Sequence, residues 1–514
     1  MAMRLTGAAL ALPAASKMSG EAQARTGGSA SSTGVGGFNV KSFGAKGDSD
    51  INASTGTDDT AAIQAAITYI YRLGGGTLYF PEGYYRITSF LTLCANLTII
   101  GAGKKASYIV TAMTGGGGGS TDLDVRNGTA LYSNWPSNSS INASIVIEHL
   151  ALCCSNAGNV GAAFYDNCGT FIILRDCLLR GFKYGAIFDQ SELFDVLDCI
   201  VEPANNQGAG IWLVNRGDLK VGNSSGFTNR GSVQRCQINA GGTVYGILDD
   251  GGNTHAFEDN NYNGCLKHIR VAGVVGLRIS GGEFESAANE NINFHAMTLA
   301  GSPVGNSAAV WLGGGAQIIP TAGRSCVVAN SLGNITISGV FFGNTTAAKF
   351  VGAANCNSIY SIGAFNGGGG VTFDGRATNH FEIGHDGKSW GLRTNVPIEM
   401  SGGGIGYAPG AGGTVTQGTS KSTAVMLNKL SGQITLNAEA LAPANIASFT
   451  LNNSQIAAGD VLVLNHVSGG TPGCYSLNAR SANGCATIDI RNCSGESLSE
   501  AIVIAYVVIK AVAV

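Results

Sequence analysis

A short pattern of apolar and polar positions repeats along the middle of the chain. Each copy has an apolar residue, two variable residues, a residue that is small in most copies, one more variable residue and a second apolar residue. Most copies lie about 22 to 27 residues apart, and they are Ile147–Leu152, Leu174–Leu179, Val196–Val201, Val233–Ile238, Phe257–Tyr262, Ile279–Phe284 and Ile337–Phe342. A repeat of this length that is built from short strands is typical of a solenoid. The pattern predicts a right-handed, single-stranded parallel β-helix in which like positions stack about 4.8 Å apart.

A second apolar run in several repeats predicts another strand in each coil. The runs are Gly185–Asp189, Gly210–Val214, Tyr245–Asp249 and Lys267–Arg270. Three of the 13 cysteines take the small position of the repeat, where stacking would form a ladder inside the helix: Cys177, Cys199 and Cys236. The cysteine count is odd and no C-x-x-C spacing occurs. Most cysteines are therefore expected to be buried free thiols rather than disulfides or metal ligands.

A short helix is expected before the repeats. Its apolar positions follow helical spacing and share one face, namely Ile63, Ala66, Ile67 and Ile70. Thr57 is the expected N-cap, and the glycines at 74–76 end the helix. Because the first coil of a β-helix has an unpaired edge, the expected role of this helix is to cap it.

Composition divides the rest of the chain into domains. Residues 1–37 are rich in Ser, Gly and Ala and predict a flexible segment, although the first 16 residues also loosely resemble a secretory signal. The β-helix is expected over residues 38–400. A glycine-rich linker at 401–413 precedes short, antiparallel-looking strands, and residues 414–514 are expected to form a C-terminal β-sandwich that serves trimerisation or glycan binding.

The low charge of the chain limits the kinds of partner. Charged residues make up 12% of the sequence, about half the share usual in soluble domains, and the net charge is −3. This balance does not suit phosphate neutralisation, so no nucleic acid partner is expected. No apolar run reaches the roughly 18 residues of a membrane-spanning helix, and no membrane partner is expected.

Five runs carry a family resemblance. Three of them resemble the opening of pectate-lyase-like β-helices: Asn39–Asp48 (NVKSFGAKGD), Thr57–Ala66 (TDDTAAIQAA) and Gly75–Tyr85 (GGTLYFPEGYY). That superfamily includes polygalacturonases, rhamnogalacturonases and phage tailspike depolymerases. Two later runs are similar to the C-terminal domain of phage tail fibres and tailspikes, namely Gly413–Thr423 (GTVTQGTSKST) and Asn492–Ile504 (NCSGESLSEAIVI).

The combination resembles a tailspike of the phage virion tail; a secreted bacterial protein is the alternative. The resemblance implies a homotrimer that binds and cleaves bacterial surface polysaccharide, either capsule or O-antigen. It also implies attachment of the N-terminus to other phage tail or baseplate proteins. The polygalacturonase blocks Asn-Thr-Asp, Gly-Asp-Asp, Gly-His-Gly and Arg-Ile-Lys do not occur in order, so pectin is not the expected substrate.

Glycoside hydrolysis requires two carboxyl groups, one protonated and one ionised, about 5 to 9.5 Å apart. Five acids gather in one stretch of this weakly charged chain and are the candidate catalytic residues: Asp249, Asp250, Glu258, Glu283 and Glu285. Glu283 lies among apolar neighbours and is the expected general acid. Glu258 is flanked by polar residues and is the expected base. Strand geometry places these two about 8–11 Å apart, which predicts inversion at the anomeric carbon.

Neighbouring side chains could hydrogen-bond to sugars or stack on them. The candidate substrate-binding residues are His255, Asn261, Tyr262 and Arg270. No cofactor and no metal ion is expected.

Three alternatives stay open. A rival acidic cluster consists of Asp189, Glu192, Asp195 and Asp198. The protein could be a tail fibre that binds its receptor without cleaving it. It could also be a polysaccharide lyase acting on uronate-containing glycan, with basic groups supplied by Lys267, His268 and Arg270.

Overall fold

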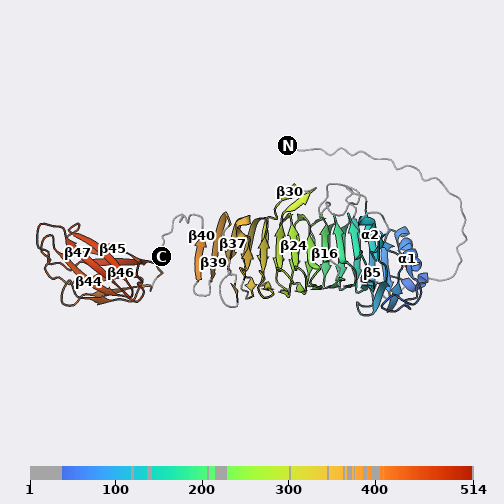
Figure 1. Cartoon of the computed structure of the whole chain (residues 1–514), viewed down its shortest axis with the longest axis horizontal. Coiled ribbons are helices and arrows are strands. Elements are labelled where there is room, and N and C mark those ends of the chain that lie inside the picture. The colour runs from blue at the N-terminus through green and yellow to red at the C-terminus, as the bar shows by residue number, and fades with distance from the viewer. Residues whose placement is uncertain are drawn as a thin grey trace. The chain divides into compact units, whose positions relative to one another are not determined.

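The computed structural model describes residues 37–511, apart from 117–120, 136–141, 205–207, 215–227, 300–301, 344–346, 363–364, 367–372, 375–376, 386–389, 395–405 and 409. The chain divides between residues 397 and 398 into two compact units (Figure 1). Each unit has its own hydrophobic core.

The first unit is a parallel β-helix, which confirms the fold expected from the repeat. Three long sheets, here called A, B and C, run along it, and successive coils add strands to each (Figure 1). One coil contributes β10 (Ala162–Asn167) to sheet C, β11 (Thr170–Arg175) to sheet A and β12 (Leu178–Arg180) to sheet B. Strands of adjacent coils pair in parallel and in register, so side chains at like positions stack.

The remaining strands of the first unit have these bounds. Sheet A contains β1 (Phe38–Asn39), β2 (Gly76–Phe80), β5 (Leu97–Gly101), β8 (Asn142–Glu148), β14 (Glu192–Leu197), β17 (Thr228–Asn229), β18 (Ser232–Gln234), β21 (Gly252–Asn253), β22 (Ala256–Glu258), β25 (Val274–Val275), β26 (Arg278–Ser280), β31 (Val310–Gly313), β34 (Leu332–Ser338), β37 (Cys356–Ile362), β39 (Asn379–His385) and β40 (Trp390–Thr394). Sheet B contains β3 (Gly83–Arg86), β6 (Ser107–Thr111), β9 (Ala151–Cys154), β15 (Ile200–Glu202), β19 (Gln237–Asn239), β23 (Asn261–Asn263), β27 (Glu283–Glu285), β32 (Gln317–Ile319), β35 (Phe341–Phe342) and β38 (Phe365–Asn366). Sheet C contains β4 (Leu91–Thr92), β7 (Leu131–Asn134), β13 (Tyr184–Asp189), β16 (Ala209–Val214), β20 (Tyr245–Asp249), β24 (Ile269–Ala272), β28 (Ile292–His295), β33 (Val327–Ala329) and β36 (Phe350–Val351). A separate hairpin joins β29 (Met297–Leu299) to β30 (Ser302–Gly305).

The six-residue repeat marks the corner where the chain passes from sheet A to sheet B. In one copy, Val196 belongs to β14 and Val201 to β15, with Asp198 and Cys199 between them. Asp198 has a φ of 56°, a left-handed conformation that Asp tolerates better than most residues and that turns the chain sharply. Residues on the two sides of this corner therefore project from two different sheets.

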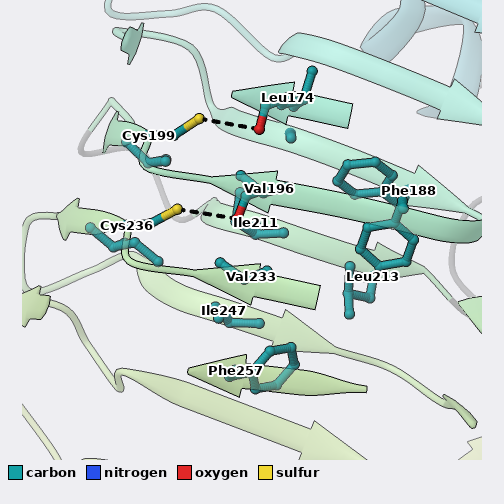
Figure 2. Close-up of a cluster of buried hydrophobic side chains, with 14 of the residues drawn as sticks. Leu174, Phe188, Val196, Cys199, Ile211, Leu213, Val233, Cys236, Ile247 and Phe257 are labelled. Carbon is teal, nitrogen blue, oxygen red and sulfur yellow. Dashed lines mark hydrogen bonds between the residues drawn. The ribbon is translucent and has the colours of Figure 1, made fainter. Parts of the chain in front are cut away.

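The predicted cysteine ladder lies inside the first unit. Cys177, Cys199 and Cys236 are free thiols and are 0%, 1% and 2% exposed. Figure 2 shows the Cys199 thiol donating to the carbonyl of Leu174 at 3.7 Å. Burial raises the pKa of the Cys199 thiol well above its usual value. These cysteines act as small core residues, as the repeat indicates.

The expected capping helix is α1 (Thr60–Arg72), whose Ile63, Ala66, Ile67 and Ile70 are buried. Its predicted N-cap is wrong, because Asp59 takes that position. The Thr57 hydroxyl and backbone N–H are instead held by the Asp48 carboxylate at 3.0 and 2.8 Å. A 3-10 helix, η1 (Val40–Phe43), packs beside α1; a second short helix, α2 (Thr121–Asn127), and a second 3-10 helix, η2 (Ala353–Asn355), also occur.

The second unit is the expected β-sandwich. One sheet contains β41 (Gly412–Thr416), β43 (Ser431–Thr435), β48 (Val503–Ile509) and β45 (Val461–Ser468). The other contains β42 (Val425–Met426), β44 (Ile446–Asn452), β47 (Cys485–Asn492) and β46 (Tyr475–Ala482). Alternate residues of both sheets form its core, including Ile434, Phe449, Ile488 and Ile504. Across the described residues of both units, no helix is long and apolar enough to cross a membrane.

Candidate functional site

Three of the nine predicted site residues lie inside the β-helix. Asp249 and His255 are 0% and 1% exposed, and His255 Nδ1 lies 2.8 Å from Asp249 Oδ2. His255 Nε2 lies 2.9 Å from the carbonyl oxygen of Thr228. Burial lowers the pKa of His255, but the charge and hydrogen bond of Asp249 outweigh burial and raise it. Both polar groups are satisfied within the interior, so the predictions of Asp249 as a catalytic carboxyl and of His255 as a sugar-binding residue are wrong.

Tyr262 is also an interior residue. It is 1% exposed, and its ring stacks on Phe284 at 4.7 Å and on His268 at 5.7 Å. The prediction that Tyr262 stacks on a sugar is therefore wrong. His268, considered for a lyase, is equally buried, and its Nε2 lies 2.8 Å from the carbonyl oxygen of Glu285. Burial lowers the pKa of His268 to about 4.

The predicted catalytic pair, Glu258 and Glu283, is divided by a corner. Glu258 ends β22 in sheet A, whereas Glu283 begins β27 in sheet B. The distance expected along one strand does not apply, because the chain turns after Glu258, at Asp259 with a φ of 53°. Glu258 is also engaged elsewhere, since its Oε1 lies 2.8 Å from Nε of Arg278.

Glu283 and Glu285 lie together on the outer face of sheet B. They are the two outward residues of β27, and the buried Phe284 lies between them. In the preceding coil, Asn261 pairs with Glu283 and Asn263 with Glu285. We call this surface the amide face. Apart from the two glutamates, its outward residues on β19 and β23 and the first outward residue of β32 are all amides: Gln237, Asn239, Asn261, Asn263 and Gln317.

The two carboxyl groups of the amide face lie close enough for Glu283 to affect the pKa of Glu285. The negative charge of Glu283, then burial and a hydrogen bond to Glu283, raise the pKa of Glu285. Asn261 Nδ2 donates to Glu283 Oε2 at 3.4 Å. Among the described residues, no lysine or arginine forms an ion pair with either carboxyl. The raised pKa makes Glu285 the better candidate for the acid of the pair, whereas the sequence favoured Glu283 as the acid.

Asp250 and Arg270 lie on the outer side of sheet C. Arg270 Nη1 is 3.0 Å from Asp250 Oδ1, and the Trp212 indole donates to Asp250 Oδ2 at 2.7 Å. The Arg270 guanidinium is 6.0 Å from the ring centre of Tyr245. These two residues therefore form an ion pair with an aromatic neighbour, away from the amide face.

A basic group that the sequence interpretation missed lies next to this pair. His295 is one coil after Ala272, just as Asn293 is one coil after Arg270. Burial, followed by the positive charges of Arg270 and Lys267, lowers the pKa of His295. Lys267 is paired with Glu290 at 2.7 Å. The register of sheet C could have revealed His295, but the strand that contains it, β28, is not among the runs predicted from the sequence.

The rival acidic cluster does not form a site. Asp189 is fully buried in sheet C, whereas Asp198 is exposed at a corner and paired with Arg235 at 2.8 Å. The Ser232 hydroxyl donates to Asp195. Within the described parts of the chain, no group of three or more His, Cys, Asp or Glu side chains is arranged to hold a metal ion.

A family model matches the start of the first unit. Residues 37–156 match the model described as rhamnogalacturonase A/epimerase, pectate lyase-like. The matched segment contains the runs that resemble pectate-lyase-like proteins, and the unit it opens is a parallel β-helix.

Individual proteins are similar to shorter or more divergent parts of the chain. Alginate lyase 7 of Azotobacter vinelandii is 47% identical over 79 residues, which are 14% of this chain and only 8% of that protein. The A-module of mannuronan C-5 epimerase AlgE4 from the same bacterium has a TM-score of 0.46 and 16% identity, covering 64% of this chain and 91% of that one. Geobacillus virus E2 ORF18 has a TM-score of 0.32 and 17% identity, covering 90% of this chain and 75% of that one.

Proposed function

We propose that this chain is a polysaccharide depolymerase that hydrolyses glycosidic bonds at the amide face, with Glu285 as general acid. The observation that supports this most directly is the pair Glu283 and Glu285. Two like charges on one exposed strand, with no cation paired to them in the described structure, destabilise the fold and are typical of functional sites. The charge of Glu283 raises the pKa of Glu285, which is the direction of shift that a general acid for glycoside cleavage requires.

The close spacing of Glu283 and Glu285 favours retention of configuration at the anomeric carbon, rather than the inversion expected from the sequence. Retaining enzymes hold their carboxyls about 5–5.5 Å apart, whereas inverting enzymes need about 6.5–9.5 Å to admit a water molecule. Residues two apart on a strand have Cα atoms about 7 Å apart and side chains on the same side. Glu285 would donate its proton to the leaving oxygen, and the ionised Glu283 would attack the anomeric carbon. The same Glu285 would then deprotonate the water that releases the sugar.

The amides of the neighbouring coils suit the binding of sugar hydroxyls. Each amide side chain has both donors and an acceptor, and a sugar hydroxyl can use either. The opening runs resemble pectate-lyase-like β-helices and the C-terminal runs resemble tail fibres and tailspikes. Together with the amides, this combination supports a bacterial surface polysaccharide as substrate. It also supports a homotrimeric phage tailspike whose N-terminus binds other tail or baseplate proteins.

Two carboxamide variants test the hydrolysis. Glu285→Gln and Glu283→Gln should each lower the release of reducing ends from purified host polysaccharide by about 10² to 10⁴-fold, because each removes one of the two acid–base functions. Glu82→Gln, an exposed carboxyl in the turn between β2 and β3, is the matched control and should retain full activity. Full activity in Glu285→Gln would overturn the assignment.

A second candidate is a polysaccharide lyase on the outer face of sheet C. It is favoured by His295, whose lowered pKa keeps it neutral and able to accept a proton beside the cations Arg270 and Lys267. These cations suit a uronate carboxylate, and alginate lyase 7 is named for an activity of this class. A lyase would release unsaturated, ultraviolet-absorbing ends, and Arg270→Ala would abolish them. A tail fibre without enzymatic activity would release no ends at all.

A further inference from the structure

A line of outward residues crosses the later coils of sheet A, away from both sites described above. Register places Arg278, Trp311, Thr336, Tyr360 and Phe381 next to one another on successive strands from β26 to β39. Tyr360 is 50% exposed, and its ring centre lies 6.0 Å from that of Phe381. This surface, the aromatic strip, presents rings to solvent where most outer positions of a sheet are polar.

Trp311 lies flat against the sheet. A Cβ at Gly313 would come within 2.4 Å of Trp311 Cζ2 and 2.7 Å of Cε2, so the indole covers the glycine backbone. The Arg278 guanidinium is 4.8 Å from the ring centre, and Glu258 holds that guanidinium at 2.8 Å. The result is a half-buried ring with a fixed guanidinium over it, a combination that offers a sugar both apolar and hydrogen-bonding contacts.

The spacing along the strip suits an extended chain rather than a single sugar. Trp311 and Tyr360 are two coils apart, about 10 Å, which is comparable to two units of an extended hexose chain. Outward amide and hydroxyl groups flank the rings, namely Asn334, Ser338 and Ser358. Among the outward side chains described on these strands, Arg278 is the single charged residue, and it is paired.

We propose that the aromatic strip is a second glycan-binding site, which holds an extended, uncharged stretch of polysaccharide along the axis of the first unit. The C–H faces of pyranose rings would contact Trp311 and Tyr360, while Arg278 and the flanking amide and hydroxyl groups would bind sugar hydroxyls. The absence of unpaired charge favours neutral hexoses over uronates. The proposal does not depend on the hydrolysis assigned to Glu283 and Glu285.

Binding of defined neutral hexasaccharides tests this site. Calorimetric titration of the full chain with cellohexaose, maltohexaose and mannohexaose should detect binding of at least one. The double variant Trp311→Ala/Tyr360→Ala should weaken that binding by about tenfold for each ring lost. Trp311→Phe should lose less, since it keeps a ring; Tyr71→Ala, which removes a 64% exposed tyrosine from α1, should bind normally.

The outcomes separate this site from the hydrolytic one. Glu285→Gln should bind the hexasaccharide as the wild type does, even when its activity is lost. A wild-type chain that binds none of the three sugars overturns the proposal, as does unchanged binding by the double variant. A change of oligomeric state in the double variant without loss of sugar binding would assign the strip to a protein contact instead. If Glu285→Gln retains activity, the proposed hydrolysis fails while the strip stands.

Discussion

Alternation along a strand decides whether a side chain faces the core or the outer surface. It correctly placed Asn261, Glu283 and Glu285 outside, because each lies next to an apolar residue that faces the core. Tyr262 occupies the last apolar position of the repeat, so the same alternation places it inside. The sequence interpretation gave more weight to its aromatic ring than to its position. Asp249 lies on the same side of the predicted run Tyr245–Asp249 as Ile247, so alternation also places it inside, whereas His255 lies in no predicted run.

Buried histidines make stability depend on pH. His268 has a pKa of about 4 in the folded protein and about 6.5 in the unfolded chain. As pH falls below about 6.5, the unfolded chain gains a proton that the folded protein does not accept until about pH 4. The unfolding free energy should therefore fall by up to about 3 kcal/mol over this range.

Urea unfolding at several pH values checks this expectation. His268→Gln, which keeps a donor for the Glu285 carbonyl, should lose less stability than the wild type between pH 6.5 and pH 4. The pKa of His255 is raised in the folded protein, so His255 stabilises the fold at low pH. This stabilisation is lost as pH rises through the pKa of the folded protein. Equal pH slopes for wild type and His268→Gln would contradict the role of His268.

Corners are the elements that the repeat located best. The small residue of each copy lies at the turn from sheet A to sheet B, where little space is available. Four strands of sheet C were also predicted, since the second apolar runs coincide with or overlap β13, β16, β20 and β24. The helix α2 and the hairpin of β29 and β30 were not predicted, because their composition follows no common period. The missed N-cap has a similar cause: Asp48, which holds Thr57, is nine residues away along the chain.

Asn260 should be critical for one corner. Its side chain is 2% exposed, accepts from the backbone N–H of Cys236 at 2.9 Å and donates to the Val233 carbonyl at 2.8 Å. Asn260→Ala leaves both backbone groups without a hydrogen-bond partner. Each unsatisfied group should lower the free energy of unfolding by about 1–3 kcal/mol. Thermal unfolding measures the loss. Asn263→Ala, an exposed amide on the adjoining strand, is the control, and an equal loss in both variants would contradict this role for the corner.

The second unit has a surface that suits assembly of several copies. Strands β45 and β48 are apolar on both faces, and their outward residues remain exposed by 36–54%: Val461, Val463, Val507 and Ile509. Strands of this composition are usually buried on both sides. We expect this face to contribute to the proposed trimer, in which charge-free surfaces can pack together without leaving ions unpaired.

A single lysine at this face should weaken assembly. Val463→Lys would bury a charge at the contact, so light scattering should show smaller species than the wild-type trimer. Ser476→Lys, on the outer face of the opposite sheet, adds the same charge and should leave the trimer intact. A monomeric wild type, or a trimer in both variants, would contradict the expected contact.

The mass of the products released from host polysaccharide tests the central claim most directly. Hydrolysis adds one water for each bond broken, so wild-type products should be saturated oligosaccharides that are heavier by one water per cleavage. Glu285→Gln should leave the polymer intact. Unsaturated products without added water would assign the reaction to a lyase, and an unchanged polymer with wild-type protein would show that the amide face does not hydrolyse it.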